Sequence, residues 1–451
     1  MVSVEKPSFR PTNVRWYVLA LIAFASSSAY LTRYCISAAN TTIQQDVGLD
    51  DKQMGLMMSV FSLGYFICQI PGGWLGTRFG TRFAFAFISA VWSLCNVMSA
   101  VSFSFLPMLG SRFLLGCFQA GLVPISAKVL RDWIPQPRRG MSSAAIGACM
   151  SLGGAFTMWF TGWLLKIDLH WRWIFASYAL VGIAWSIVYY QFFRTKPNEH
   201  QRVNKSELDL IEEKLEKAEQ PSTSNPSKKN ILLAMLTSVS MWALCIQSFF
   251  RAAGYAFFVT WFFAFLEYVY GVTKAEAGFL NSLPLLAVVI GTSCGGAVVD
   301  YLWSLTKSKW LSRSGTAVFS LAMSALFTYL SVWTNNATQL SCMIALGALF
   351  SGLGSPAAWC ASIDLGGKQT SLVIATMNMA GSVAGMVLPF LLGSWFMEIR
   401  KRAAEQIEAG GEQVEQLSGD WIAVIYLHAG FYLIGAVCWL FVRPNRSLAG
   451  P

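Results

Sequence analysis

Charged side chains are scarce in this sequence: Asp, Glu, Lys and Arg together make up 12% of its 451 residues. Soluble domains carry about a quarter charged residues, so this scarcity argues against a soluble globular protein. Hydrophobic residues reach 55% instead, and many of them fall in apolar runs that are long enough to cross a bilayer. The sequence therefore predicts a membrane protein.

Motifs for covalent or metal chemistry are also lacking. The ten cysteines occur singly, without a CxxC pair, which argues against disulfide staples and metal ligands. No Ser/His/Asp, metal-ligand or paired-carboxylate constellation lies at a plausible depth. The glycine-rich stretch 291–296 follows no strand and precedes no Lys-Ser/Thr pair, so it predicts helix packing and not a phosphate loop. We expect no enzymatic activity, no cofactor and no metal.

What the sequence does contain is an internal repeat of glycines. Each glycine of the first set recurs 223 positions later in the second set; the pairs are Gly48 and Gly271, Gly55 and Gly278, Gly72 and Gly295, and Gly73 and Gly296. Two similar halves within one hydrophobic chain are typical of a secondary transporter, whose site lies between the repeats.

Apolar segments fall into two groups of six. Their approximate centres are Ala25, Phe61, Ala90, Phe118, Gly153, Ala184, Ser248, Val288, Ala322, Leu346, Ala380 and Gly435. We therefore predict an all-α membrane protein of about twelve transmembrane helices, with an N-terminal six-helix bundle (1–193), a linker (194–230) and a C-terminal six-helix bundle (231–451). Within the linker, Ser206 and Asp209 have the spacing of an N-cap and its acidic N3 residue, which predicts one short helix.

Basic residues gather on one side of this map. They are Lys6, Arg10, Arg15, Arg78, Arg82, Arg131, Arg138, Arg139, Lys228, Lys229, Lys307, Lys309, Arg313, Arg443 and Arg446. By the positive-inside rule this side is cytoplasmic, which predicts a plasma (inner) membrane protein with both termini inside. The rule also accounts for most of the net charge of +10, so we expect no nucleic-acid partner.

One group of basic residues does not fit the predicted topology. Residues 400–402 read Arg-Lys-Arg and would lie outside, in a charged stretch that reaches Asp420 and is interspersed with glutamates. We interpret it either as a short external amphipathic helix or as a disordered loop.

Three arginines stand inside predicted spans, where a charge is costly unless it lines a cavity or pairs; Arg33 and Arg251 are the deeper two. Arg33 shares a helical face with Tyr30 and Ser37, and Arg251 shares one with Tyr255. No acid in the first six spans can neutralise Arg33. Because a guanidinium grips carboxylate or phosphate through paired hydrogen bonds, we favour substrate binding by both arginines over structural pairing.

Other polar residues in the spans carry weaker signals. Arg112, near the start of the fourth span, could bond neighbouring helix carbonyls, and we favour that structural role. Asn378 and Trp359 could contact a hydroxylated substrate or simply join helices. His428 is interpreted as a core histidine, with a proton relay as the minor alternative.

A loop motif between the second and third spans carries a family resemblance. The residues Gly73-Trp74-Leu75-Gly76-Thr77-Arg78-Phe79-Gly80-Thr81-Arg82 resemble the major facilitator superfamily pattern G-x-x-x-D-R-x-G-R/K-R/K. This gating motif latches helix ends by charge and dipole contacts. Thr77 replaces its acid, whereas the second-half equivalent keeps Asp300, so we expect a weaker latch in the first half.

Within that superfamily the chain resembles the anion:cation symporters, which include phthalate, hexuronate and galactonate permeases and vesicular glutamate transporters. The resembling segments begin at Ile70, Arg112, Trp171, Asp364 and Met377. The resemblance implies that Arg33 anchors substrate in the first helix and that Arg251 matches the seventh-helix arginine of the glutamate transporters.

Two departures from this family concern coupling. Proton-coupled members carry Asp before the first arginine and Glu in the fourth helix, where this sequence has Thr32 and Gln119. Neither side chain takes up a proton. Coupling then uses other groups, such as Asp300, Glu267 or the candidates Asp364 and His428, or the protein exchanges anions. The Phe118-Gln119 pair also resembles organophosphate:phosphate antiporters.

The first hypothesis is therefore a monomeric transporter of small carboxylates such as sugar acids, working by alternating access with a coupling ion (proton or sodium) or a counter-anion. The second is an organophosphate:phosphate exchanger, and a receptor or scaffold without transport is the hypothesis from another class. Candidate substrate contacts are Arg33, Arg251, Tyr30, Gln119, Tyr255, Trp359 and Asn378.

Overall fold

The computed structural model describes residues 10–212, 228–366, 370–408 and 414–444. Within these ranges, twelve helical segments are long and apolar enough to cross a membrane, and no strand occurs. A spanning segment must satisfy its backbone hydrogen bonds internally, which helices achieve. The predicted all-α fold is confirmed, and the protein is a multi-pass membrane protein.

Six spans belong to residues 1–193, called here the first half. Its helices are α1 (Val14–Ala38), α2 (Asn40–Val47), α3 (Asp51–Arg78), α4 (Thr81–Ala100), α5 (Phe105–Gln119), α6 (Leu122–Trp133), α7 (Gln136–Lys166) and α8 (Trp171–Phe192). Between the halves lie α9 (Lys205–Glu212) and α10 (Lys228–Thr237). Because α10 runs across residue 230, the predicted linker boundary falls inside a helix; the division of the chain into three parts stays a prediction.

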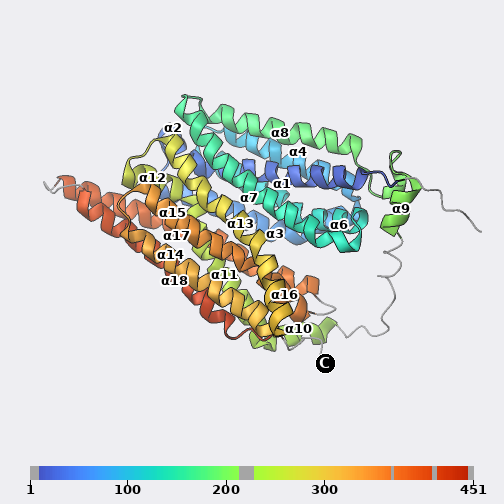
Figure 1. The fold of residues 1–451 in the computed structure, drawn as a ribbon. Coiled ribbons are helices and arrows are strands. Elements are labelled where there is room, and N and C mark those ends of the chain that lie inside the picture. The colour runs from blue at the N-terminus through green and yellow to red at the C-terminus, as the bar shows by residue number, and fades with distance from the viewer. Residues whose placement is uncertain (1–9, 213–227, 367–369, 409–413, 445–451) are drawn as a thin grey trace, which may run out of the picture.

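Six further spans belong to residues 231–451, the second half. Its helices are α11 (Val239–Thr260), α12 (Phe262–Tyr270), α13 (Lys274–Thr306), α14 (Thr316–Leu330), α15 (Ala337–Leu353), α16 (Ser355–Gly366), α17 (Thr370–Glu408) and α18 (Val414–Trp439). Figure 1 shows the halves side by side, close together at the end that carries α2 and α12 and farther apart at the end that carries α6, α10 and α16. We call these the α2–α12 end and the α6–α16 end.

The repeated glycines occupy equivalent places in the two halves. Gly48 ends α2 with φ 72°, and Gly271 ends α12 with φ 62°. Glycine adopts this left-handed conformation without the steric cost of a side chain. At this pair, the sequence repeat therefore corresponds to a structural repeat.

A second glycine pair lies where the halves touch. A Cβ atom on Gly55 of α3 would lie 2.4 Å from the carbonyl oxygen of Pro389 on α17. A Cβ atom on Gly278 of α13 would lie 2.5 Å from the carbonyl oxygen of Met158 on α7. Both distances are shorter than real Cβ contacts, so the halves approach this closely only because the positions carry no side chain.

Polar contacts join the halves at the α2–α12 end. The hydroxyl of Thr41 donates to Glu267 over 2.7 Å, and the hydroxyl of Tyr268 donates to the side-chain oxygen of Gln44 over 3.0 Å. Lys274 donates to the hydroxyl of Thr42 over 2.9 Å. These bonds link α2 to α12 and to the start of α13.

Arg400 contributes to the same closure. It forms an ion pair of 3.2 Å with Asp51, whose side chain is 3% exposed. The charged stretch around Arg400 was predicted as a separate helix or a disordered loop; residues 398–408 are instead the continuation of α17. Pairs four residues apart, Glu398 with Arg402 and Lys401 with Glu405, support that extension. Residues 409–413 of the stretch lie outside the described residues.

The N-cap of the linker helix lies two residues before the predicted one. The side chain of Asn204, and not that of Ser206, accepts the amide of Glu207 over 2.9 Å, so α9 starts at Lys205. Asn and Ser are both good N-caps, and the sequence alone did not separate them.

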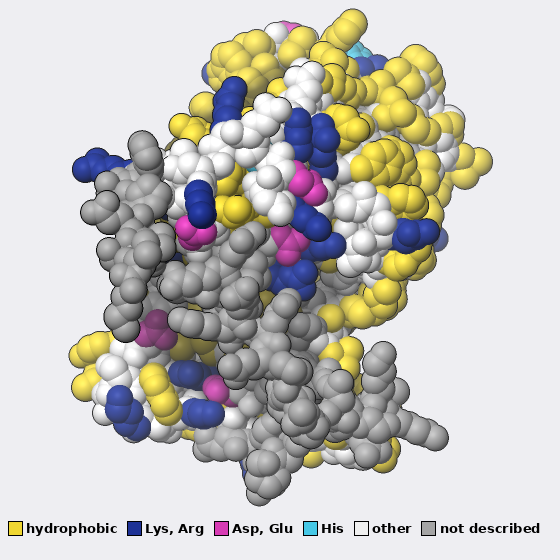
Figure 2. All heavy atoms as spheres, turned by 90° about the vertical axis from the view of Figure 1, so that its right-hand side faces the viewer, with side chains coloured by type: hydrophobic (Ala, Val, Ile, Leu, Met, Phe, Trp, Pro, Cys, Tyr) yellow, Lys and Arg dark blue, Asp and Glu magenta, His cyan; other side chains and the backbone are white. Residues whose placement is uncertain are grey.

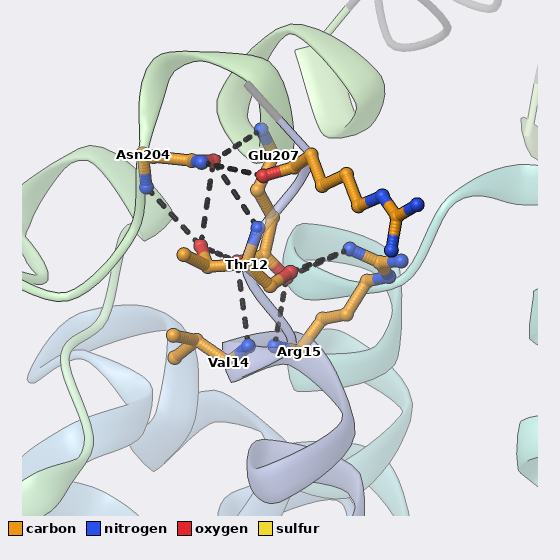
Figure 3. Close-up of polar contacts among 6 residues, drawn as sticks. Thr12, Val14, Arg15, Asn204 and Glu207 are labelled. Carbon is orange, nitrogen blue, oxygen red and sulfur yellow. Dashed lines mark hydrogen bonds and ion pairs between the residues drawn. The ribbon is translucent and has the colours of Figure 1, made fainter. Parts of the chain in front are cut away.

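Glu207 then fastens the linker to the start of α1 (Figure 3). Its fully buried carboxylate accepts the hydroxyl of Thr12, the amides of Val14 and Arg15 at 3.3 and 3.1 Å, and the guanidinium of Arg15 at 2.8 Å. An anion at a helix N-terminus is favoured by the free amides and the helix dipole. Part of the linker is therefore a fixed element of the first half.

Candidate binding site between the two halves

A cavity of about 320 Å³ lies between the halves. Helices α1, α3 and α5 line it from the first half, and α11 and α17 line it from the second. The lining residues are Tyr30, Arg33, Tyr34, Ile36, Ser37, Met58, Phe61, Ser62, Tyr65, Arg112, Ala252, Tyr255, Ala256, Val259, Thr260, Gly381, Ser382, Gly385 and Pro389.

Arg33 brings a positive charge to this cavity. Its guanidinium carbon lies 4.6 Å from the ring centre of Tyr30, 4.7 Å from that of Phe61 and 5.1 Å from that of Tyr65. The described lining contains no Asp, Glu or His. Aromatic rings stabilise the cation without neutralising it, so Arg33 keeps a full positive charge for an anion.

Gln119 lies behind Arg33 and not at the cavity. Its side-chain oxygen accepts the Nε of Arg33 over 3.3 Å, and its amide donates to the carbonyl of Ala29 and the hydroxyl of Thr32 over 3.0 and 2.9 Å. It is fully buried and absent from the lining. Gln119 was predicted to contact substrate. In this structure it instead lies outside the cavity lining and orients Arg33.

Arg112 lines the cavity and directs both of its Nη atoms at backbone carbonyls. Its two Nη atoms donate to the carbonyls of Thr32 and Arg33, each over 3.1 Å. The predicted bonding to neighbouring helix carbonyls is confirmed. These bonds hold α5 against α1 next to Arg33, and the buried Nε of Arg112 has no partner among the described residues.

Arg251 does not meet Arg33 in this cavity. Tyr255, on the same helix, lines the cavity as predicted, whereas Arg251 is absent from the lining and its buried Nε has no partner among the described residues. The helical-face argument thus placed one of these two residues at the cavity; a ligand role for Arg251 stays a prediction.

Trp359 and Asn378 are also absent from the lining, whereas Ser382 on the face of Asn378 is present. Trp359 is 43% exposed, and Asn378 accepts the Ser382 hydroxyl at its backbone carbonyl over 3.1 Å. In this conformation neither predicted contact reaches the site.

The two coupling candidates lie elsewhere. Asp364 forms ion pairs with Lys309 at 3.1 Å and Arg313 at 3.2 Å. The ring of His428 is buried, with Nδ1 2.7 Å from the carbonyl of Val424. Neither residue lines the cavity, which agrees with a structural role for each.

The gating motif lies at the α6–α16 end. Arg82 donates to the carbonyl of Tyr190, in the last turn of α8, over 2.9 Å. Gly73 packs near Pro124, and Gly80 has φ 81°. Among the described residues no ion pair involves Arg78 or Asp300, and Asp300 is exposed. The expected charge latch is thus not formed in this conformation, and its role stays a prediction.

Sequence reasoning missed the aromatic partners of Arg33 on α3. Phe61 and Tyr65 are four residues apart and so share a helical face. That spacing is visible in the sequence. However, nothing in the sequence indicates that α3 turns this face toward Arg33, because the contact depends on how α1 and α3 pack.

Comparison with known proteins shows the following similarities. The family model described as Major Facilitator Superfamily matches residues 22–389. A probable sulfoacetate transporter from Cupriavidus necator is 27% identical over 97% of this chain and 96% of its own length. A D-galactonate transporter from Escherichia coli O6:H1 is 25% identical over 85% of this chain and 90% of its own length.

Among solved structures, a bacterial homolog to the human lysosomal transporter Spinster, in an inward-facing and unoccupied conformation, has a TM-score of 0.74. It is 19% identical and covers 96% of this chain and 99% of its own, which supports the fold. With a family model that matches most of its length and two six-span halves around a central cavity, this chain belongs to the major facilitator superfamily.

Proposed function

We propose that the protein is a secondary transporter of small organic anions, held between its halves by Arg33. The observation that carries this proposal is a guanidinium without a carboxylate partner among the described residues, in a cavity lined by both halves. The relatives named above are described as a probable sulfoacetate transporter and a D-galactonate transporter, which supports an organic acid as the substrate. Transport, and not catalysis, is the proposed activity.

Alternating access follows from where the halves touch. Bonds such as Thr41 with Glu267 and the close approaches at Gly55 and Gly278 lie at or toward the α2–α12 end. Opening there and closing at the α6–α16 end exposes the cavity to the other side. The basic residues of the α6–α16 end, visible in Figure 2, support the proposal that this end is cytoplasmic in the plasma (inner) membrane, with both termini inside.

Organophosphate exchange is the less favoured function. A phosphate monoester carries close to two negative charges at neutral pH, and one of the two arginines that line the cavity, Arg112, already directs both Nη atoms at backbone carbonyls. The Phe118-Gln119 pair suggested this function in the sequence. In the structure Gln119 hydrogen-bonds to Arg33 and is absent from the cavity lining. The protein is proposed to act as a monomer, with a proton, sodium or a counter-anion as the coupling partner.

Uptake into proteoliposomes tests the proposal. The purified protein is reconstituted and offered labelled sugar acids, dicarboxylates and sugar phosphates, with and without internal phosphate. We expect saturable uptake of an organic acid that does not need internal phosphate. Uptake of sugar phosphate only in exchange for internal phosphate would support the exchanger instead, and uptake of none of these anions would reject the transport proposal.

A further inference from the structure

We propose that the first half binds an anionic phospholipid at the α6–α16 end, with the phosphate on Arg78 and Arg82 and the acyl chains along a row of phenylalanines. We call this row, Phe79, Phe83 and Phe87, the aromatic strip. The surface lies outside the central cavity, so the inference does not depend on which substrate the protein carries.

The two arginines have no acid to neutralise them. Arg78 is the last residue of α3 and is exposed, and Arg82 is the second residue of α4 and is partly exposed. Between Asp51 and Asp132 the sequence contains no Asp or Glu. Asp132 is paired with Arg131 at 3.1 Å, whereas among the described residues neither Arg78 nor Arg82 forms an ion pair. Two positive charges therefore remain uncompensated at this turn.

Arg82 is held in a fixed orientation. Its Nε donates to the carbonyl of Tyr190 over 2.9 Å, and its guanidinium carbon lies 4.4 Å from the centre of the Tyr190 ring. These contacts leave both Nη atoms of Arg82 without a partner among the described residues. An oriented guanidinium with free Nη atoms suits the paired hydrogen bonds that phosphate accepts.

The segment that follows α8 adds positive charge beside the same turn. A Cβ atom at Gly80 would lie 3.2 Å from the hydroxyl of Thr195, so the two segments are adjacent. Residues 186–199 contain two cations, Arg194 and Lys196, and one acid, Glu199, which leaves a net charge of +1. The surroundings of the two arginines are therefore basic as well.

The aromatic strip continues from the arginines along α4. Phe79, Phe83 and Phe87 are 54%, 46% and 40% exposed, and their spacing of four residues places them along one side. Ring centres lie 6.1 Å apart between Phe79 and Phe83 and 5.7 Å apart between Phe83 and Phe87. In Figure 1, α4 lies on the side of the first half that is away from the second half. The strip therefore faces the bilayer.

A phospholipid matches both parts of this surface. Its phosphate meets the arginines at the end of a span, where headgroups lie, and its acyl chains cover the exposed rings. An anionic lipid is favoured over a zwitterionic one because Arg78 and Arg82 attract net negative charge, while neither of them nor the strip offers an acid to a cationic headgroup. A soluble phosphate ester would contact the arginines but leave the strip uncovered.

Native mass spectrometry of the intact protein tests the charge preference. The protein is titrated with phosphatidylglycerol or phosphatidylcholine of identical acyl chains. We expect the wild type to bind phosphatidylglycerol at least about tenfold more tightly, and the double variant Arg78→Gln/Arg82→Gln to bind both lipids about equally. Equal binding of the two lipids by the wild type, or an unchanged preference in this variant, would overturn the proposal.

Two controls accompany that titration. Lys307→Gln/Arg443→Gln removes two charges from exposed positions of the second half at the same end and should keep the wild-type preference. Glycerol phosphate, the soluble counterpart of the headgroup, should not displace bound phosphatidylglycerol at equal concentration. Displacement by glycerol phosphate would show that the arginines bind phosphate alone and would reject the lipid.

Photolabelling locates the acyl chains. Phosphatidylglycerol with a photoreactive acyl chain should label residues 79–87 several-fold more than the matching phosphatidylcholine does. Phe83→Ala/Phe87→Ala should remove that difference, whereas Leu433→Ala/Val437→Ala, an exposed pair with the same spacing on α18, should keep it. If the arginine variant does not fold, wild-type labelling still decides, because equal labelling of residues 79–87 by both lipids would overturn the proposal.

Discussion

Arg33 is positioned by two neighbours, Gln119 behind the cavity and Arg112 at its lining. Gln119 holds its Nε, while Arg112 bonds the carbonyl of Arg33 itself over 3.1 Å. Pre-organisation of this kind reduces the entropy that a long side chain loses when it binds a ligand. At the scale of single residues, the site is thus an arginine whose side chain is held by a neutral amide and whose backbone carbonyl is held by a second arginine.

Replacing Gln119 with Glu tests this arrangement. A carboxylate cannot donate to the carbonyl of Ala29, as the amide of Gln119 does over 3.0 Å, and it competes with substrate for Arg33. We expect KM at neutral pH to rise about tenfold, or ~1.4 kcal/mol, and to fall again in acid, where a protonated carboxyl donates. KM is measured across pH, and Gln119→Leu serves as the uncharged control. A pH profile equal to that of the wild type would contradict the positioning role.

The depth of each side chain was the part of the site that sequence could not predict. Arg33 and Tyr255 were placed correctly at the cavity because helical periodicity assigns a face. Arg251 shares the face of Tyr255 but lies one helical turn away, beyond the lining. Periodicity fixes direction around a helix, and the cavity ends where neighbouring helices meet, which depends on tertiary packing.

At the scale of elements, α9 is fixed to α1 through a single buried acid. We predict that Glu207→Gln lowers stability by about 3 kcal/mol, because Arg15 is left without its buried partner. The control is Asp209→Asn, which removes the same charge from an exposed position of α9. Thermal unfolding in detergent and hydrogen exchange of the first turn of α1 report the effect. If both variants unfold at the wild-type temperature, the contact of Glu207 with the start of α1 does not contribute to stability.

The repeated glycines make a prediction about closure. Gly55→Ala or Gly278→Ala puts a methyl group within 2.5 Å of a carbonyl of the other half, so each should force the α2–α12 end apart and reduce transport several-fold. Distances between spin labels on α2 and α12 measure the opening. Gly296→Ala is the matched control, since nothing lies within 4 Å of its added carbon. Unchanged distances in all three variants would show that the close approach is dispensable.

The ends of helices can be explained from the sequence where local residues determine them. They cannot be predicted where contacts with another helix determine them. Gly48 and Gly271 end their helices through their own left-handed backbone conformation. By contrast, α17 continues past Arg400, whose ion pair with Asp51 lies on another element. The sequence contains both charges, but no local signal indicates that α3 and α17 meet.

For the whole molecule, the absence of Asp, Glu and His from the described cavity lining bears on proton coupling. We predict that an imposed pH gradient, with membrane potential clamped, drives only weak accumulation of a fully ionised substrate. Uptake by proteoliposomes measures this directly. Strong accumulation would place the proton site elsewhere, and variants of Asp364 and His428 would then be the first to compare.

Glu267 offers a different form of pH sensitivity at the contact of the halves. Burial raises its pKa, although the Thr41 hydrogen bond and the nearby Lys274 oppose the shift. Tyr268, Asp51 and Arg400 are the other charged or titratable groups of this contact. A pKa that is higher in the closed arrangement means that proton uptake favours closure and that rising pH weakens it.

The central claim is that Arg33 anchors an organic anion between the halves, and uptake by Arg33→Lys proteoliposomes tests it most directly. Lysine keeps the charge but loses the planar fork. We predict a loss of at least about tenfold in kcat/KM, equivalent to ~1.4 kcal/mol of transition-state stabilisation, with thermal unfolding in detergent unchanged. Arg33→Ala should be inactive. Full organic-acid uptake by well-folded Arg33→Ala would show that the substrate is held elsewhere and would contradict the account.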